Sequence, residues 1–228
     1  MFNLKKILYL LPYFSCMGKR LIIVRHGEST WNFQHKYTGW VNVPLTKNGI
    51  NECKIVSNKL LKNNIIPKIS YTSELKRCID SNNIILNNMH LNIDTIRTWR
   101  LNERHYGLIS GHDRRVLKWQ GKYFDNPPIV NKIDNLKMYK THEYNPIYGE
   151  SYYMTSIRMM PIWKTLIIPD ILNNKIPLIC SHKNSIKTIM QDIENIPNDK
   201  VHDIKVENAV PIIYDFDEHM NVINKFII

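Results

Sequence analysis

The chain has 228 residues, 43% of them hydrophobic, which is enough for one domain, or one core with an inserted segment. Its formal net charge is +11, which favours anionic partners such as nucleic acid, membrane surfaces or phosphorylated metabolites. The basic residues are scattered, and no zinc-finger or RNA-binding motif accompanies them, which argues against nucleic acid. The four cysteines show no metal-ligand or redox spacing, which indicates buried free thiols in a reducing compartment.

The first residues differ in character from the rest. Lys5 and Lys6 precede an apolar stretch at 7–14 that resembles part of a signal peptide, but Pro12 interrupts it and no small-residue cleavage site follows. The stretch is too short to span a bilayer, so no membrane partner is expected. We interpret 1–16 as a leader or a non-native extension before a single domain at 17–228. A cytoplasmic protein is expected, although the apolar stretch leaves targeting open.

Apolar patterning predicts strands that alternate with helices. The unbroken apolar run at 21–24 predicts a strand covered on both faces. A helix is expected at 49–62, with Thr46 as its N-cap. A second strand is expected at 67–72, followed by a helix that Ser73 caps. A third strand is expected at 93–99.

The second half begins irregularly and then resumes the alternation. Periodicity breaks down at 125–149, so we expect a cap or insertion at about 112–150. Helical spacing returns at Ile186, Ile189, Met190 and Ile193. Strands are expected at 210–216 and 222–228. This order predicts an α/β fold, a three-layer, doubly wound, mostly parallel sheet with an irregular cap insertion.

Two histidines stand where predicted strands end. His26 follows the strand at 21–24, and His182 follows a second apolar run at 178–180. Because ligands of doubly wound sheets bind at the carboxyl ends of strands, both imidazoles are expected to face one pocket. Two such histidines suit phosphoryl transfer through a phosphohistidine. One imidazole attacks phosphorus, and neighbouring N–H donors hold the equatorial oxygens.

The residues around His26 suit a nucleophile. An imidazole with an ordinary pKa near ~6.5 needs little activation at pH 7. Arg25 offers a bidentate phosphate clamp, and Gly27 allows close approach of the backbone. Asn32 can donate its amide to the same phosphate.

Together with the run Arg-Leu-Asn-Glu-Arg-His-Tyr-Gly at 100–107, these motifs resemble the cofactor-dependent phosphoglycerate mutases of the histidine phosphatase superfamily. The resemblance implies interconversion of 3-phosphoglycerate and 2-phosphoglycerate in glycolysis through a phosphohistidine. It also implies 2,3-bisphosphoglycerate as the phosphoryl primer, no metal, a small anionic phosphorylated substrate, and a homo-oligomer, either a dimer or a tetramer.

The resemblance assigns roles to individual residues. His26 would be the nucleophile and His182 would stabilise the transferred group. Glu103 would be the general acid–base, because the leaving oxygen of a glycerate needs a proton. The other matched residues would bind phosphate or substrate: Arg25, Asn32, Thr38, Gly39, Arg77, Arg104, Tyr106, Arg114 and Asn184.

Three departures from the family pattern all lie where substrate is held. Lys183 stands where the resembled motif has glycine, and the loop at 207–209 lacks its Pro-Thr-Gly. A shortened helix removes an Arg-Arg pair that mutases use on the distal phosphate, unless Arg114 and Arg115 replace it. Two alternatives therefore stay open: a histidine-type phosphatase that hydrolyses small phosphorylated metabolites, and an inactive phosphate-binding module.

Overall fold

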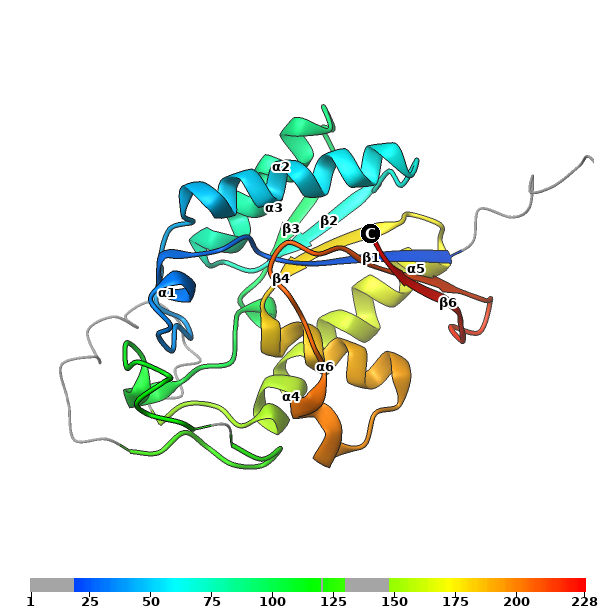
Figure 1. Cartoon of the computed structure of the whole chain (residues 1–228). Coiled ribbons are helices and arrows are strands. Elements are labelled where there is room, and N and C mark those ends of the chain that lie inside the picture. Colours follow the sequence, from blue (N-terminus) through cyan, green and yellow to red (C-terminus); the bar gives the residue numbers. More distant parts are fainter. Residues whose placement is uncertain (1–18, 120, 130–147) are drawn as a thin grey trace, which may run out of the picture.

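The computed structural model describes residues 19–119, 121–129 and 148–228. A single six-stranded sheet lies between two layers of helices (Figure 1), with strand order β3-β2-β4-β1-β5-β6. Strands β1 to β4 pair in parallel, and β5 and β6 extend the sheet by antiparallel pairing. This arrangement confirms the predicted mostly parallel α/β sheet. The expected leader at 1–16 and most of the irregular stretch at 125–149 lie outside the described residues.

The strands are Lys19–Arg25 (β1), Ile69–Thr72 (β2), Thr95–Arg97 (β3), Pro177–Ser181 (β4), Ile212–Phe216 (β5) and Val222–Ile227 (β6). Of these, β3 is shorter than the predicted strand at 93–99. It pairs with β2 over three residues only, and Trp99–Leu101 then turns into a 3-10 helix. Thr98 ends the extended segment, because its side chain accepts a hydrogen bond from the amide of Arg100 and caps that turn.

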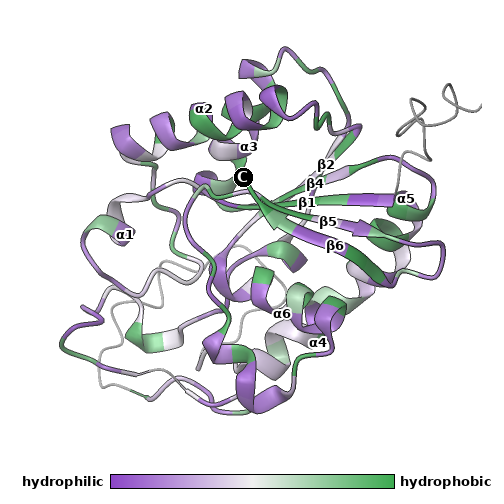
Figure 2. Ribbon diagram, turned by 45° about the vertical axis from the view of Figure 1, so that its right-hand side comes forward, coloured by the Kyte–Doolittle hydropathy of each residue, from purple (hydrophilic) through white to green (hydrophobic). Residues whose placement is uncertain are grey.

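The α-helices are Thr30–Phe33 (α1), Lys47–Lys62 (α2), Lys76–Asn88 (α3), Tyr152–Ile162 (α4), Ile168–Leu172 (α5) and Lys183–Glu194 (α6). A π-helix at Trp163–Ile167 joins α4 to α5. In Figure 1, α2 and α3 cover one face of the sheet, and α4, α5 and α6 cover the other. Figure 2 shows that hydrophobic residues concentrate on the strands between these layers, while the helices carry both hydrophobic and hydrophilic residues.

The central position of β1 in the sheet explains why residues 21–24 are all apolar. Leu21 and Ile23 belong to the core between the sheet and α4–α6, whereas Ile22 and Val24 belong to the core under α2 and α3. Each of the four side chains is fully buried. A strand buried on both faces needs apolar residues at every position.

One of the two predicted helix caps is present. Thr46 accepts a hydrogen bond from the amide of Gly49 at 3.0 Å and caps α2, as predicted. The prediction for Ser73 is wrong, because α3 begins at Lys76 with Leu75 at its N-cap. The hydroxyl of Ser73 lies instead 2.8 Å from a ring nitrogen of His182. Among the described residues, no helix is both long and apolar enough to cross a membrane.

Candidate active site

The two histidines lie side by side at the carboxyl edge of the sheet. Because β1 and β4 are parallel neighbours with Arg25 opposite Ser181, His26 and His182 leave the sheet at the same level. Their ring centroids are 5.0 Å apart, with an angle of 62° between the planes. Of the two, His26 lines the small pocket described below, whereas His182 is fully buried behind it and is not among the lining residues.

The hydrogen bonds of His26 favour one tautomer. Its Nδ1 lies 2.7 Å from the carbonyl oxygen of Gly27, which can only accept. Nδ1 therefore carries the proton, and Nε2 keeps its lone pair. The Nε of Arg77 donates to that Nε2 at 3.3 Å. This unprotonated nitrogen therefore lies beside a cation.

Contacts with Ser73 and Cys78 hold the imidazole of His182 in place. Ser73 Oγ and Cys78 Sγ lie 2.8 Å and 3.1 Å from His182 Nε2. His182 is also the N-cap residue of α6. The position of His182 is therefore fixed by β4 and α6, by Ser73 just before α3, and by Cys78 within α3.

Both imidazoles are kept neutral. Burial, followed by the charges of Arg77 and Arg25, holds the pKa of His26 well below 6.5. Burial and Arg77 lower the pKa of His182 in the same way, with smaller contributions from His26 and Arg158. A neutral His26 is the form that can attack phosphorus.

Two arginines lie near His26 and are held by backbone carbonyls. Arg77 donates from Nη1 to Val41 and from Nη2 to Gly39, at 2.9 and 2.8 Å. Arg25 donates from Nη1 to the carbonyl of Val206 at 3.0 Å. Burial lowers the pKa of Arg25 to about 10, so the guanidinium stays charged at neutral pH. Gly39 thus holds an arginine and does not line the pocket itself.

The amide of Asn32 is oriented by a capping box at the start of α1. Asn32 Oδ1 accepts from the amide and hydroxyl of Ser29, at 3.2 and 2.9 Å, and the hydroxyl of Ser29 caps the amide of Asn32. Asn208 donates to the carbonyl of His26 at 2.8 Å, so the altered loop at 207–209 supports the strand end. With its oxygen engaged, Asn32 presents its amide nitrogen to the pocket.

Glu103 is buried beside the start of α6. Its Oε1 accepts from the backbone amides of Arg104 at 2.8 Å and Asn184 at 3.1 Å. The amide group of Asn184 joins two phenols, because it donates to Tyr106 Oη at 2.8 Å and accepts from Tyr152 at 2.7 Å. Glu103 also lines the small pocket described next.

These residues enclose a small pocket of about 30 Å³, hereafter the phosphate pocket. Its lining includes nine residues that the sequence predicts: Arg25, His26, Asn32, Thr38, Arg77, Glu103, Tyr106, Arg114 and Asn184. Lys36, Tyr37 and Lys183 line it as well. Its size and its cations suit one tetrahedral anion.

A larger cavity of about 370 Å³, hereafter the basic chamber, adjoins the phosphate pocket. The two share five lining residues: Tyr37, Tyr106, Arg114, Lys183 and Asn184. The remaining lining residues of the chamber are Arg104, Lys118, Trp119, Tyr152, Lys187 and His202. Arg104 therefore lines the basic chamber and not the phosphate pocket. In the chamber it could contact the part of a bound ester that lies beyond the phosphate.

The two neighbouring arginines that could replace the lost Arg-Arg pair have different surroundings. Arg114 lines both cavities. Arg115 is exposed and pairs with Asp113, with 2.5 Å between Nη2 and Oδ2. Only one of the two is therefore available to a ligand in this structure.

Sequence reasoning missed an ion pair that supports the site. Arg158 on α4 donates to both carboxylate oxygens of Glu150 and to the carbonyls of Asn102 and Glu103. A helical arginine and a glutamate in an irregular stretch give no sequence signal for such a contact. The hydroxyl of Tyr152 is a second such contact, because it donates to Asn184 and helps to orient its amide.

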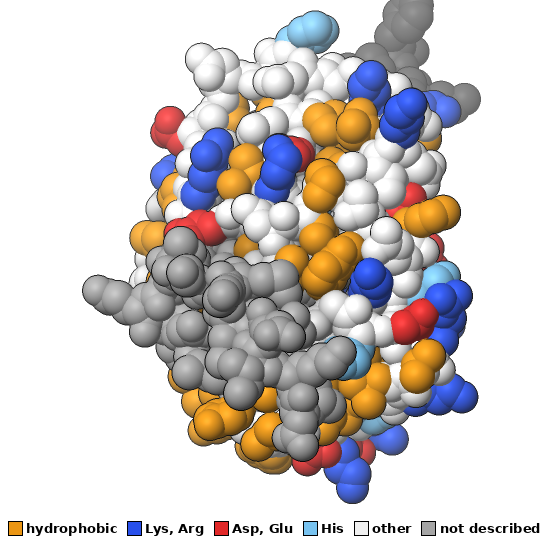
Figure 3. Space-filling model, turned by 90° about the vertical axis from the view of Figure 1, so that its left-hand side faces the viewer, with side chains coloured by type: hydrophobic (Ala, Val, Ile, Leu, Met, Phe, Trp, Pro, Cys, Tyr) orange, Lys and Arg blue, Asp and Glu red, His pale blue; other side chains and the backbone are white. Residues whose placement is uncertain are grey.

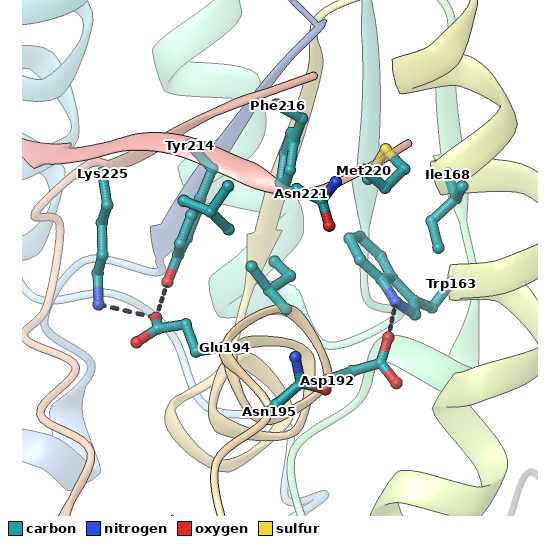
Figure 4. Close-up of a pocket in the computed structure, with 12 residues that line it drawn as sticks. Trp163, Ile168, Asp192, Glu194, Asn195, Tyr214, Phe216, Met220, Asn221 and Lys225 are labelled. Carbon is teal, nitrogen blue, oxygen red and sulfur yellow. Dashed lines mark hydrogen bonds and ion pairs between the residues drawn. The ribbon is translucent and has the colours of Figure 1, made fainter. Parts of the chain in front are cut away.

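A separate cavity of about 510 Å³ lies at the other end of α6, beside β5 and β6 (Figure 4). Its two carboxylates already accept hydrogen bonds. Asp192 accepts from the indole of Trp163, and Glu194 accepts from Tyr214 and Lys225. This cavity contains none of the residues that suit phosphoryl transfer.

On the face in Figure 3, the described basic side chains are spaced among apolar and acidic ones and form no continuous stripe. Within the described ranges, no group of three or more His, Cys, Asp or Glu side chains is placed to hold a metal ion.

Comparison with known proteins agrees with this geometry. A family model described as "Histidine phosphatase superfamily (branch 1)" matches residues 21–228. A 2,3-bisphosphoglycerate-dependent phosphoglycerate mutase of Neisseria meningitidis is 33% identical over 223 residues, which cover 90% of this chain and 98% of that protein. One of Lactobacillus acidophilus is 32% identical, with 90% and 97% covered.

Solved structures show the same fold at lower identity. A mycobacterial glucosyl-3-phosphoglycerate phosphatase in complex with VO3 superposes with a TM-score of 0.67 at 17% identity, covering 92% of this chain and 96% of that one. A phosphoserine phosphatase mutant from Entamoeba histolytica superposes with a TM-score of 0.64 at 22% identity, covering 90% and 95%. The chain therefore belongs to the histidine phosphatase superfamily.

Proposed function

We propose that this protein is a phosphoglycerate mutase that interconverts 3-phosphoglycerate and 2-phosphoglycerate through a phosphohistidine on His26, after priming by 2,3-bisphosphoglycerate. The observation that carries the proposal is the junction of two cavities. A phosphate pocket with a neutral nucleophile opens beside a chamber lined by cations. The first suits the transferred phosphoryl group and the second suits an anionic glycerate.

The residues divide the chemistry between them. Nε2 of His26 attacks phosphorus while Arg25 and Arg77 neutralise the equatorial oxygens. The neutral imidazole of His182 donates to the same group. Glu103 gives a proton to the departing glycerate oxygen and takes one back when the phosphoryl group returns to the other hydroxyl.

A mutase must also retain its bisphosphorylated intermediate between the two transfers. Among the described residues that line the basic chamber, five side chains are cationic and none is a carboxylate. An intermediate with two phosphates and a carboxylate would be held there by charge-assisted hydrogen bonds. Retention of this kind favours return of the phosphoryl group over its loss to water.

A hydrolase that consumes small phosphate esters is the second candidate. The chamber is large enough to admit water beside a bound phosphohistidine, and Arg115 faces Asp113 and not the chamber. Without enough clamps the intermediate would dissociate, and water would then take the phosphoryl group.

One experiment separates these candidates. The protein is incubated with 2,3-bisphosphoglycerate and isotopically labelled 3-phosphoglycerate, and both isomer exchange and free phosphate are followed. We expect acid-labile phosphate on His26 and exchange in excess of release. Release in excess of exchange would make the protein a phosphatase. Absence of phosphohistidine would leave a binding module only, and labelling of His26→Ala would refute the assigned nucleophile.

A further inference from the structure

Two lysines of α6 project into the basic chamber. Lys183 and Lys187 are four residues apart, so they lie on one face of the helix, with about 5–6 Å between their Cβ atoms. Lys183 also lines the phosphate pocket, whereas Lys187 lines only the chamber. The pair therefore extends away from His26 along the direction in which a bound ester would extend.

The environment of Lys187 is unusual for a lysine. Its side chain is 2% exposed, and Nζ donates to the carbonyl of His202 at 2.7 Å and lies 5.9 Å from the ring of Tyr152. An ammonium has three donors. Within the described contacts, one donor is used and no carboxylate pairs with the charge. Burial of a lysine in this way is costly unless an anion meets it.

The position of Lys183 is also unfavourable in the absence of a ligand. It is the first residue of α6, where the helix dipole is positive and disfavours a cation. Burial, together with the charges of Arg25 and Arg114, lowers its pKa. An anion between these groups would relieve the repulsion. Two adjoining lysines at unfavourable positions are better explained by a ligand than by packing.

Building on the proposed function, we propose that Lys183 and Lys187 form the subsite for the second phosphoryl group of bound 2,3-bisphosphoglycerate. The main clamp for that group thus lies on α6. Arg114 lines the same chamber and adds one further cation, whereas Arg115 faces Asp113. The protein without a phosphoryl group on His26 would therefore bind the bisphosphate more tightly than a ligand with one phosphoryl group.

Binding in a background without turnover tests this assignment. In the His26→Ala protein, titration calorimetry gives the Kd for 2,3-bisphosphoglycerate and for inorganic phosphate. Adding Lys187→Met should raise the Kd for the bisphosphate about 10-fold to 100-fold, as expected for a charge-assisted clamp. The Kd for inorganic phosphate, which needs only the phosphate pocket, should change far less. Lys187→Arg should recover most of the affinity.

Several outcomes would overturn the assignment. Equal changes for the two ligands, or no change for either, would show that Lys187 is structural or idle. If Lys187→Met does not fold, Lys183→Met carries the test, since Lys183 is partly exposed. Lys59→Met removes an exposed cation at the end of α2 and should alter neither Kd. Failure of the wild-type protein to form phosphohistidine would refute the proposed function and leave this binding comparison valid.

Discussion

Arg158 and Glu150 form a buried ion pair, with 2.6 Å between Nε and Oε1, directly behind the loop that carries Glu103. Burial alone would raise the pKa of Glu150, but Arg158 and the amide of His105 outweigh it and hold that pKa below its ordinary value. The pair therefore stabilises the fold above the ordinary pKa of a glutamate. This stabilisation is lost as pH falls through the lower folded-state value.

The first prediction concerns this pair. Arg158→Leu should lower the free energy of unfolding by about 3–5 kcal/mol, because it leaves the charge of Glu150 buried and unpaired. Urea unfolding measures the change. The matched control is Lys76→Ala, which breaks the half-exposed pair with Asp80 and should cost less than about 1 kcal/mol. Equal losses would mean that the buried pair contributes no more than a surface contact.

The second prediction concerns the protonation of the two histidines. Because their pKa values lie well below 6.5, both imidazoles should remain neutral at pH 6, whereas an ordinary imidazole would be mostly protonated. Nitrogen NMR of labelled protein reports this directly, with His26→Gln and His182→Gln for assignment. A midpoint near 6.5 for either ring would contradict it. In the unfolded chain both rings protonate freely, so stability should fall as pH drops below about 6.5.

The third prediction concerns the thiols. Cys53, Cys78 and Cys180 are free and buried, and burial raises the pKa of Cys53. Contact with Cys78, followed by burial, raises that of Cys180. In a Cys16→Ser variant, none of the three should react with Ellman's reagent until urea unfolds the protein. Rapid reaction of any one under native conditions would show that the structure opens around it.

The fourth prediction distinguishes two adjacent arginines. Arg114→Ala removes a cation from both cavities and should shift the products of 2,3-bisphosphoglycerate from isomerised glycerate toward free phosphate. One charge-assisted clamp contributes about 1.5–3 kcal/mol, or roughly 10-fold to 100-fold in the ratio. Arg115→Ala should leave the ratio unchanged, because Arg115 is exposed and faces Asp113. The reverse order would show that this segment rearranges when substrate binds.

The fifth prediction concerns pH and the basic chamber. Burial, together with the charges of Lys183 and Arg104, lowers the pKa of Lys187 to about 8, although the charges of Glu103 and Asp203 oppose the shift. The ammonium is present below that pH and lost above it. The affinity of His26→Ala protein for 2,3-bisphosphoglycerate should therefore weaken as pH passes 8. His202 contributes a carbonyl and Tyr152 a ring, so neither replaces the charge.

For the fifth prediction, Lys187→Arg is the control, because a guanidinium keeps its proton throughout this pH range. Its affinity should stay level where that of the parent protein declines. The same decline in both proteins would assign the titration to another group.

The sequence predicts the sheet and its central site well for a physical reason. The four apolar residues at 21–24 are all buried only if helices cover both faces of the strand. A strand in that central place lies beside β4, so the ends of β1 and β4 come together. Side-chain contacts between distant segments have no such signature. The hydroxyl of Ser73 suits a helix cap equally well until His182 competes for it, and nothing in the spacing of Lys183 and Lys187 tells whether that face is buried.

The capping box at Ser29 and Asn32 has a consequence for ligand entry. A free asparagine can turn its amide either way, and a phosphate would have to select the correct orientation on arrival. In this chain the capping box at the start of α1 fixes the orientation of the Asn32 amide in the folded protein, before any ligand binds. Little side-chain entropy is then lost when the anion binds, and an arriving phosphate finds a donor whose reorganisation is complete.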